Sequence, residues 1–199
     1  MMSKSNTTGR FVVLDGPNGV GKTTITAPVA ERLRKSGLTV FQTKEPTSRF
    51  RRDNEEQHRG VELAQLIVED RRQHLMLDIE PALARGEWVI SDRYVCSSLV
   101  FRALDGVSFE ETWAANNAFL VPDVSIVLTA SAGTLEKRLS ERSTRTRFER
   151  EHSSQKEINL YEQATDFLRE KGYAMHVVLN DHCTAEETIA TITGLVSKW

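Results

Sequence analysis

A glycine-rich loop followed by a lysine and a threonine lies close to the start of the chain. Its residues GPNGVGKTT fit the pattern G-x-x-x-x-G-K-S/T through Gly16, Gly21, Lys22 and Thr23. Glycines suit such a loop because its backbone N–H groups must turn inward to phosphate oxygens, where a Cβ would obstruct the approach. In this pattern the lysine neutralises the β- and γ-phosphates and the threonine hydroxyl ligates magnesium. We therefore predict a nucleotide-binding loop.

The loop identifies a phosphate donor but leaves three classes of protein open: phosphotransferases, GTPase switches and ATPases. The tetrapeptide N-K-x-D, with which GTPases read guanine, does not occur in the sequence. Hydrolytic ATPases commonly end the second acidic strand in Asp-Glu, whereas here Asp92 is followed by Arg93. An arginine at this point suits a second phosphate held in line with the donor. The sequence favours a phosphotransferase, and a P-loop protein that binds or hydrolyses ATP without an acceptor remains the alternative.

Five short apolar runs rich in β-branched residues predict the strands that position these groups. They are FVVLD (11–15), TVFQTKE (39–45), WVISD (88–92), VSIVLTA (124–130) and HVVLN (176–180). The segments between them have helical periodicity and are too long for hairpins, which predicts crossover helices between parallel strands. Helices are expected over about 22–36, 60–85, 94–104, 108–119, 131–143, 153–171 and 185–198, and Pro81 could break the second of these. The fold class is α/β, with a parallel sheet covered on both faces.

Composition narrows the function classes further. The 199 residues carry 26 Lys and Arg against 28 Asp and Glu, a net charge of -2, which argues against nonspecific binding to nucleic acid or to an anionic membrane. Two cysteines are too few for a disulfide framework, and no apolar run is long enough to span a membrane. We predict a single cytoplasmic domain over 1–199 with a flexible tail over 1–9. The charge-dense stretches 49–59 and 137–151 are expected to be mobile surface segments.

A second set of motifs surrounds the end of the third strand. Residues 92–102 read D-R-Y-x-x-S-S-x-x-F-R, Glu45-Pro46 closes the second strand, and Asp70-Arg71 lies in the helix predicted over 60–85. Together with the P-loop and an arginine-rich stretch after the fourth strand, these motifs resemble the thymidylate kinase family over nearly the whole chain. The resemblance implies a three-layer P-loop kinase fold with a five-stranded parallel sheet in the order 2-3-1-4-5. It also implies a homodimer and a small arginine-rich lid at about 138–153.

The resemblance further implies a reaction, the transfer of the ATP γ-phosphate to dTMP to give dTDP, with ATP and Mg²⁺ as cofactors. The residues it marks as catalytic are Lys22, Asp92, Arg93, Arg142, Arg145 and Arg147. Those it marks as donor-binding are Gly16, Asn18, Gly19, Gly21, Lys22, Thr23 and Thr24, with Thr23 and Asp92 on the metal.

The acceptor-binding residues implied by the resemblance come from four parts of the chain. They are Asp15, Glu45, Ile67, Arg71, Arg93, Ser97, Ser98, Phe101 and Arg102. In the family, the counterpart of Arg93 grips the acceptor phosphate and that of Arg71 hydrogen-bonds the pyrimidine edge. Ser97, Ser98 and Arg102 occupy positions that face the base, and Phe101 stands where an aromatic ring crowds the sugar 2′ position.

Four positions depart from the family pattern. Asn18 replaces a residue that is usually acidic, Asp15 stands where Glu is common, and Ile67 replaces a phenylalanine that stacks on thymine. Arg102 replaces a glutamine or a small residue. The preferred base therefore stays open, and a kinase for another pyrimidine deoxynucleotide or for a deoxynucleoside is the alternative. A deoxynucleoside kinase would need a carboxylate base, for which Asp15 or Glu45 could serve.

Overall fold

The computed structural model describes residues 9–51, 53–181 and 183–198, and the predicted tail over 1–9 falls outside it except for Gly9. Its strands are β1 (Phe11–Asp15), β2 (Val40–Lys44), β3 (Trp88–Asp92), β4 (Val124–Thr129) and β5 (Met175–Leu179). They form one parallel sheet in the order β2-β3-β1-β4-β5, in which Val12 lies opposite both Ile90 and Val124. The predicted strands and their order are therefore confirmed.

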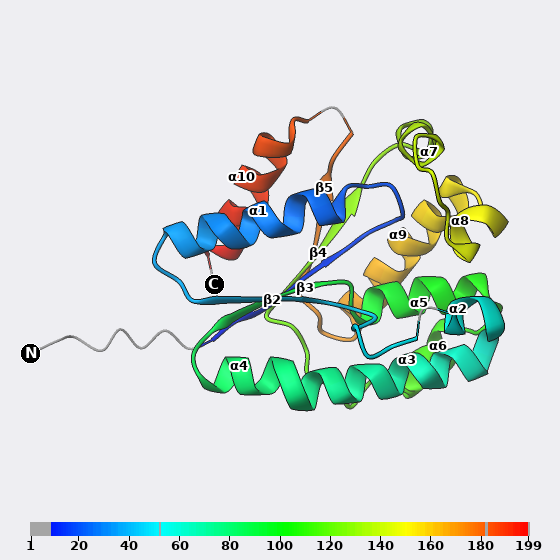
Figure 1. The fold of residues 1–199 in the computed structure, drawn as a ribbon, viewed down its shortest axis with the longest axis horizontal. Coiled ribbons are helices and arrows are strands. Elements are labelled where there is room, and N and C mark those ends of the chain that lie inside the picture. Colours follow the sequence, from blue (N-terminus) through cyan, green and yellow to red (C-terminus); the bar gives the residue numbers. More distant parts are fainter. Residues whose placement is uncertain (1–8, 52, 182, 199) are drawn as a thin grey trace, which may run out of the picture.

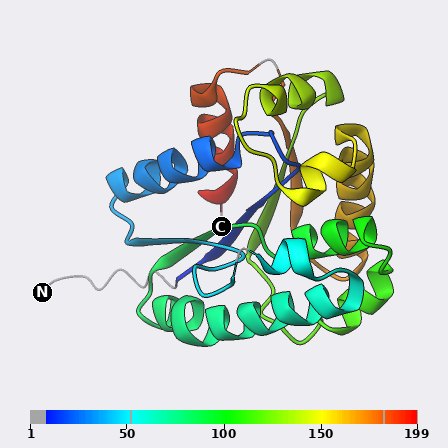
Figure 2. The ribbon, with the colours of Figure 1, turned by 45° about the vertical axis from the view of Figure 1, so that its right-hand side comes forward.

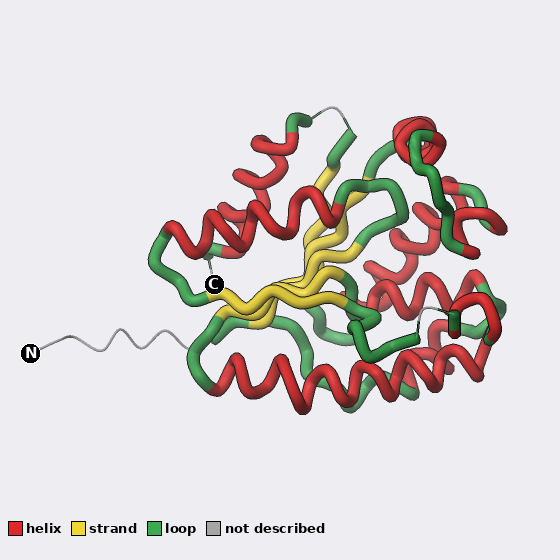
Figure 3. Tube along the Cα trace, in the orientation of Figure 1, coloured by secondary structure: helices red, strands yellow, loops and turns green. Residues whose placement is uncertain are grey.

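Helices cover both faces of this sheet (Figure 1, Figure 3). On one face lie α1 (Lys22–Lys35) and α10 (Ala185–Val196), whereas α3 (Gly60–His74), α4 (Glu80–Ala84), α5 (Val95–Leu104), α6 (Phe109–Ala114) and α9 (Ser154–Glu170) lie on the other. Side chains of β1 alternate between the two layers, because Val12 and Leu14 pack under α1 while Phe11 and Val13 pack against the opposite helices. The three-layer architecture is thus confirmed.

The helix predicted over 60–85 is continuous through Pro81. A π-helical turn, η1 (Leu75–Ile79), joins α3 to α4, and Pro81 occupies the first turn of α4. The π-helical turn changes the hydrogen-bond register immediately before Pro81, so the helix continues past a residue that cannot donate. The expected break at Pro81 is wrong for this reason.

The two charged stretches contain short helices that the sequence analysis missed. They are α2 (Asn54–Gln57) and α8 (Arg147–Glu151), and α8 follows α7 (Ala132–Ser140) in the segment 138–153, here called the lid. Figure 1 and Figure 2 both place α8 beside α2, and Arg150 forms a bidentate ion pair with Glu56 at 2.8 and 2.9 Å. Arg147, Phe148 and Glu149 are buried, so this part of the lid is packed into the protein rather than a free surface segment.

Contacts from the ends of β4 and β5 shape the loop after β1. Gly16 has φ +143°, and a Cβ on it would lie 2.3 Å from the carbonyl oxygen of Leu128 in β4. From the end of β5, the buried Asn180 donates to the carbonyl oxygen of Val20 at 2.7 Å and accepts from Thr188 Oγ1 at 2.8 Å. The carboxyl ends of β4 and β5 therefore determine the course of this loop.

Replacing Asn180 with alanine removes both of these buried hydrogen bonds. We expect the free energy of unfolding to fall by about 1–3 kcal/mol, because buried polar groups lose their best partners. Urea denaturation measures the change, with Asn159→Ala as the control, since the exposed Asn159 accepts its side-chain hydrogen bond from the exposed Gln155. Equal stability of Asn180→Ala and the wild type would contradict this role.

Candidate functional site

Two adjoining cavities lie at the carboxyl edge of the sheet. The loop cavity, about 180 Å³, is lined by Asn18, Gly19, Gly21, Lys22, Thr23, Thr24, Asp92, Arg93 and Arg142. The inner cavity, about 130 Å³, is lined by Asn18, Glu45, Pro46, Glu55, Ile67, Arg71, Arg93, Tyr94, Ser97, Ser98, Phe101, Arg102, Thr146 and Phe148. Asn18 and Arg93 line both cavities, so whatever occupies one meets the occupant of the other at these two residues.

The ammonium of Lys22 lies within the glycine-rich loop. Its Nζ donates to the carbonyl oxygens of Gly16 at 2.7 Å and Pro17 at 3.0 Å. Burial, and after it the charge of Arg93, lowers the pKa of Lys22 to about 7, although the carboxylate of Asp92 acts in the opposite direction. An added anion in this cavity would stabilise the charged form of the lysine.

Thr23 and Asp92 supply oxygen donors to the loop cavity. Asp92 Oδ1 is buried and has no hydrogen-bond partner among the described residues. Hydroxyl and carboxylate oxygens suit Mg²⁺, which takes one or two protein ligands together with water and phosphate oxygens. Both residues therefore fit the metal role that the sequence analysis expected of them.

Arg93 joins the two cavities and is held in an unusual backbone conformation. Its φ of +76° lies in the left-handed region, which costs free energy in a residue other than glycine. Nη1 donates to Ser97 Oγ and Tyr161 Oη, both at 3.0 Å, and Nη2 donates to Asn18 Oδ1 at 2.8 Å. Three separate segments thus orient the guanidinium between the cavities.

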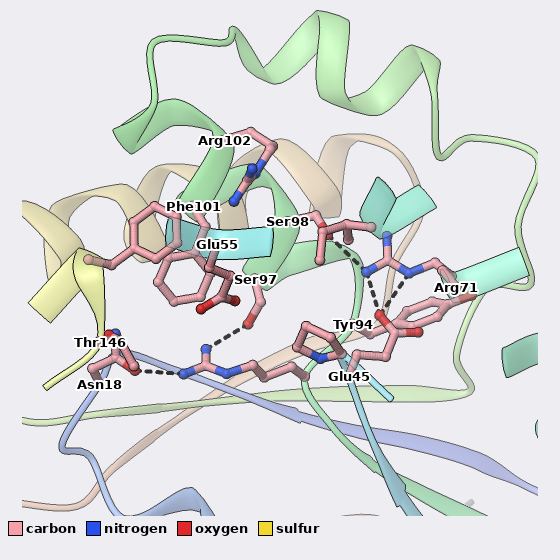
Figure 4. Close-up of a pocket in the computed structure, with 14 residues that line it drawn as sticks. Asn18, Glu45, Glu55, Arg71, Tyr94, Ser97, Ser98, Phe101, Arg102 and Thr146 are labelled. Carbon is pink, nitrogen blue, oxygen red and sulfur yellow. Dashed lines mark hydrogen bonds and ion pairs between the residues drawn. The ribbon is translucent and has the colours of Figure 1, made fainter. Parts of the chain in front are cut away.

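Arg71 lies at the opposite end of the inner cavity. Its Nε and Nη2 donate to Glu45 Oε2 at 2.9 and 2.5 Å, Nη2 also donates to Ser98 Oγ at 2.9 Å, and Nη1 donates to Asn116 Oδ1. Among the described residues, one hydrogen of Nη1 has no partner, and this hydrogen is available to a ligand. Figure 4 shows Arg71 with Glu45 and Ser98 at one end of the cavity and Asn18 with Thr146 at the other.

Glu45 is the buried carboxylate that orients Arg71. His74 contacts its Oε1 at 3.2 Å through Nδ1, and Nε2 of the same ring contacts Thr43 Oγ1 at 2.6 Å. Burial alone would raise the pKa of the Glu45 carboxyl, but Arg71 and His74 together hold it below its usual value. Sequence reasoning missed His74 and Asn116, because their partners are far away along the chain.

Asp15 lies behind the cavity wall rather than in it. The residue is 1% exposed, and its Oδ1 accepts from Ser97 Oγ and from the Ser97 backbone N–H at 3.1 Å. Burial raises the pKa of this carboxyl. The structure thus brings Ser97 and Arg93 to the cavity, but it does not bring Asp15 there.

The remaining wall of the inner cavity is aromatic and charged. The guanidinium of Arg93 lies 4.8 Å from the Phe101 ring, which in turn lies 4.8 Å from the ring of Phe148. Arg102 also lines this wall, and burial lowers its pKa to about 10. Burial raises the pKa of Glu55, a wall residue from α2 that the sequence analysis did not identify. Ile67 presents an aliphatic side chain to the same space.

The three lid arginines that were expected to be catalytic, Arg142, Arg145 and Arg147, have different surroundings. Arg142 lines the loop cavity and donates to Glu149 Oε1 at 2.8 Å. Arg145 lines a neighbouring pocket formed by the lid itself. Arg147 is 1% exposed and donates to both carboxylate oxygens of Asp105, at 2.7 and 2.9 Å, which directs it away from the loop cavity. Of the lid arginines expected to be catalytic, the structure thus places Arg142 at the loop cavity, whereas Arg145 and Arg147 do not line it. The T-x-x-E capping box of Thr146 and Glu149 was the sequence signal for α8.

Comparison with known proteins gives a consistent result. Residues 14–181 match the family model described as Thymidylate kinase. The chain is 36% identical over 150 residues to a thymidylate kinase of Akkermansia muciniphila, covering 72% of this chain and 73% of that protein. It is 35% identical over 167 residues to a probable thymidylate kinase of Caldivirga maquilingensis, covering 80% and 75%. A thymidylate kinase of Leifsonia xyli subsp. xyli is 34% identical over 173 residues, covering 80% of each.

Binding of ATP at pH 8 should be accompanied by the uptake of up to about one proton. The pKa of Lys22 is lowered to about 7, so the side chain is mostly neutral at this pH, and an adjacent phosphate raises that pKa and recharges it. Titration calorimetry in buffers of different ionisation enthalpy measures the uptake. Lys22→Arg is the control, because a guanidinium stays charged throughout. Identical heats in all buffers for the wild type would show that Lys22 is charged before ATP binds.

Proposed function

We propose, because this chain belongs to the thymidylate kinase family, that it catalyses ATP-dependent phosphorylation of dTMP to dTDP. An oxygen of the acceptor 5′-phosphate attacks the γ-phosphorus, and the bond from that phosphorus to the β–γ bridging oxygen breaks, which releases ADP. The observation that carries this proposal is the position of Arg93 on the boundary between the two cavities. A cation at that boundary can hold the acceptor phosphate in line with the donor.

Catalysis rests on position and charge rather than on a covalent intermediate. The P-loop amides and Lys22 would hold the β- and γ-phosphates, and Arg142 would meet the negative charge of the transferring group. Thr23 and Asp92 would hold Mg²⁺, which neutralises phosphate charge when bound. The unpartnered Oδ1 of Asp92 supports this assignment.

The acceptor base would lie against Arg71. The remaining N–H of Nη1 can donate to O4 of thymine or uracil, whereas the exocyclic amine of cytosine would place a donor against a donor. Ile67 offers an aliphatic surface to the ring in place of aromatic stacking. Phe101 and its neighbour Phe148 narrow the same cavity, which supports the preference for deoxyribose that the sequence analysis expected.

The surroundings of the two candidate carboxylates disfavour a deoxynucleoside kinase. Glu45 is engaged by Arg71 and His74, and Asp15 lies behind the wall with Ser97. Neither is placed to take a proton from a 5′-hydroxyl. The inner cavity, with its arginines at both ends, likewise disfavours an ATPase that lacks an acceptor.

The homodimer and the cytoplasmic location remain proposals. Val61, Met76 and Leu77, on α3 and the adjoining η1, are more than half exposed, and a second copy would cover such apolar side chains. In the described part of the chain, no helix has the length and apolarity to cross a membrane.

The wild type should prefer dTMP, with appreciable turnover of dUMP and little of dCMP or UMP. Ile67→Phe should lower KM for dTMP by roughly two- to tenfold, because an aromatic contact adds about 0.5–1.5 kcal/mol. Measured kcat/KM values for the four nucleotides on both proteins test this. A wild-type preference for dCMP or for a ribonucleotide would exclude dTMP as the substrate, and ATP consumption that no nucleotide stimulates would exclude the kinase.

Arg142→Ala should lower kcat about 100-fold with little change in KM for dTMP, since the lost cation acts on the transferring phosphoryl group. Arg150→Ala is the matched control, because Arg150 belongs to the same lid but is exposed and pairs with Glu56. Steady-state kinetics at saturating ATP separate kcat from KM. Equal kcat values for the two variants would remove Arg142 from the chemistry.

A further inference from the structure

Two buried arginines approach one buried carboxylate at the end of α5. Arg147 of the lid takes both oxygens of Asp105, at 2.7 and 2.9 Å. Arg102 Nη1 lies 3.4 Å from Asp105 Oδ2, close enough for ionic attraction but without a hydrogen bond. The side chains of all three residues are at most 4% exposed. Asp105 thus accepts two hydrogen bonds from Arg147 and none from Arg102.

Arg102 is left with unused donors. Its Nε and Nη1 are buried and have no hydrogen-bond partner among the described residues. The same side chain lines the inner cavity, and Figure 4 shows it directed with Glu55 into the space between the two ends. Buried donors are almost always satisfied in folded proteins, so Arg102 can take a further acceptor, such as a nucleotide in the cavity that this side chain lines.

We propose that Asp105 couples the lid to acceptor binding by exchanging its arginine partner. While Arg147 holds Asp105, Arg102 is free to donate to the nucleotide in the inner cavity. When the lid arginine is withdrawn, Asp105 takes Arg102 instead, and the nucleotide loses those donors. The exchange always leaves the buried carboxylate with a cation, so Asp105 is unpaired in neither state.

The position of Arg147 extends this exchange to the donor side. Arg147 begins α8, and five residues before it Arg142 lines the loop cavity. Arg147 Nε also donates to the carbonyl oxygen of Glu55 at 2.6 Å, and Glu55 belongs to α2, which borders the inner cavity. The lid segment that places Arg142 at the phosphate donor is therefore the same segment whose Arg147 leaves Arg102 available to the acceptor nucleotide.

The test compares direct binding of dTMP, without ATP, to single and double variants by titration calorimetry. It rests on the proposed function, whose own failure would appear as a wild type that neither binds nor phosphorylates dTMP. Arg147→Met should weaken binding about tenfold, the factor that one hydrogen bond to a charged group is typically worth. Arg150→Met, in the same lid, should bind as the wild type does.

Adding Asp105→Leu to Arg147→Met should restore dTMP binding to within about threefold of the wild type. The second substitution removes the carboxylate that captures Arg102, and an apolar pair of similar size replaces the ion pair. Because an apolar pair can also restore packing, this recovery supports partner exchange only together with opposite outcomes for Arg147→Lys and Asp105→Asn. A double variant that binds as weakly as Arg147→Met, or more weakly, would overturn the proposal.

Milder variants keep the test usable if Arg147→Met fails to fold. Arg147→Lys and Asp105→Asn each break the bidentate pair from one side. Partner exchange predicts opposite outcomes: weaker dTMP binding for Arg147→Lys and nearly unchanged binding for Asp105→Asn. Equal losses in the two variants would overturn the proposal.

Discussion

The buried guanidinium of Arg93 is the interaction on which the site depends. It connects the end of β3 to the P-loop through Asn18, to α5 through Ser97 and to α9 through Tyr161. Holding an arginine in the left-handed region costs about 1–3 kcal/mol, which the surrounding bonds must offset. The strain has a geometric benefit, because an extended backbone would direct the side chain to one face of the sheet rather than across the boundary of the two cavities.

The fold was predictable because parallel strands that are buried on both faces appear in the sequence as short apolar runs. Each of the five runs became a strand, and the P-loop fell at the end of β1 as its motif requires. The helices α2 and α8 were missed, since five residues or fewer carry no helical periodicity. Their stability comes from partners far along the chain, such as Asp105 for Arg147 and Glu56 for Arg150.

The candidate site likewise contains residues that the local sequence identified and residues whose position only the fold determines. Residue types identified Lys22 and Arg93, because a cation beside a phosphate is local chemistry, whereas Arg71 was identified through the resemblance to the family. Residue types did not distinguish Arg142 from Arg147 in the lid, since both stand in one charged stretch and both pair with buried carboxylates; only the fold buries Arg147 and leaves Arg142 about half exposed. In the same way, Asp15 is one residue from the P-loop in sequence, yet the pleat of β1 directs its side chain behind the wall.

The bond from Asn180 to Val20 has a consequence for how the protein is made. The P-loop leaves a ribosome well before the side chain that fixes its last turn, which lies 160 positions further on. A nascent chain that has not yet produced β5 and α10 carries the complete phosphate-binding motif without the contacts that shape it. Nucleotide binding can therefore assist folding only after β5 and α10 have emerged.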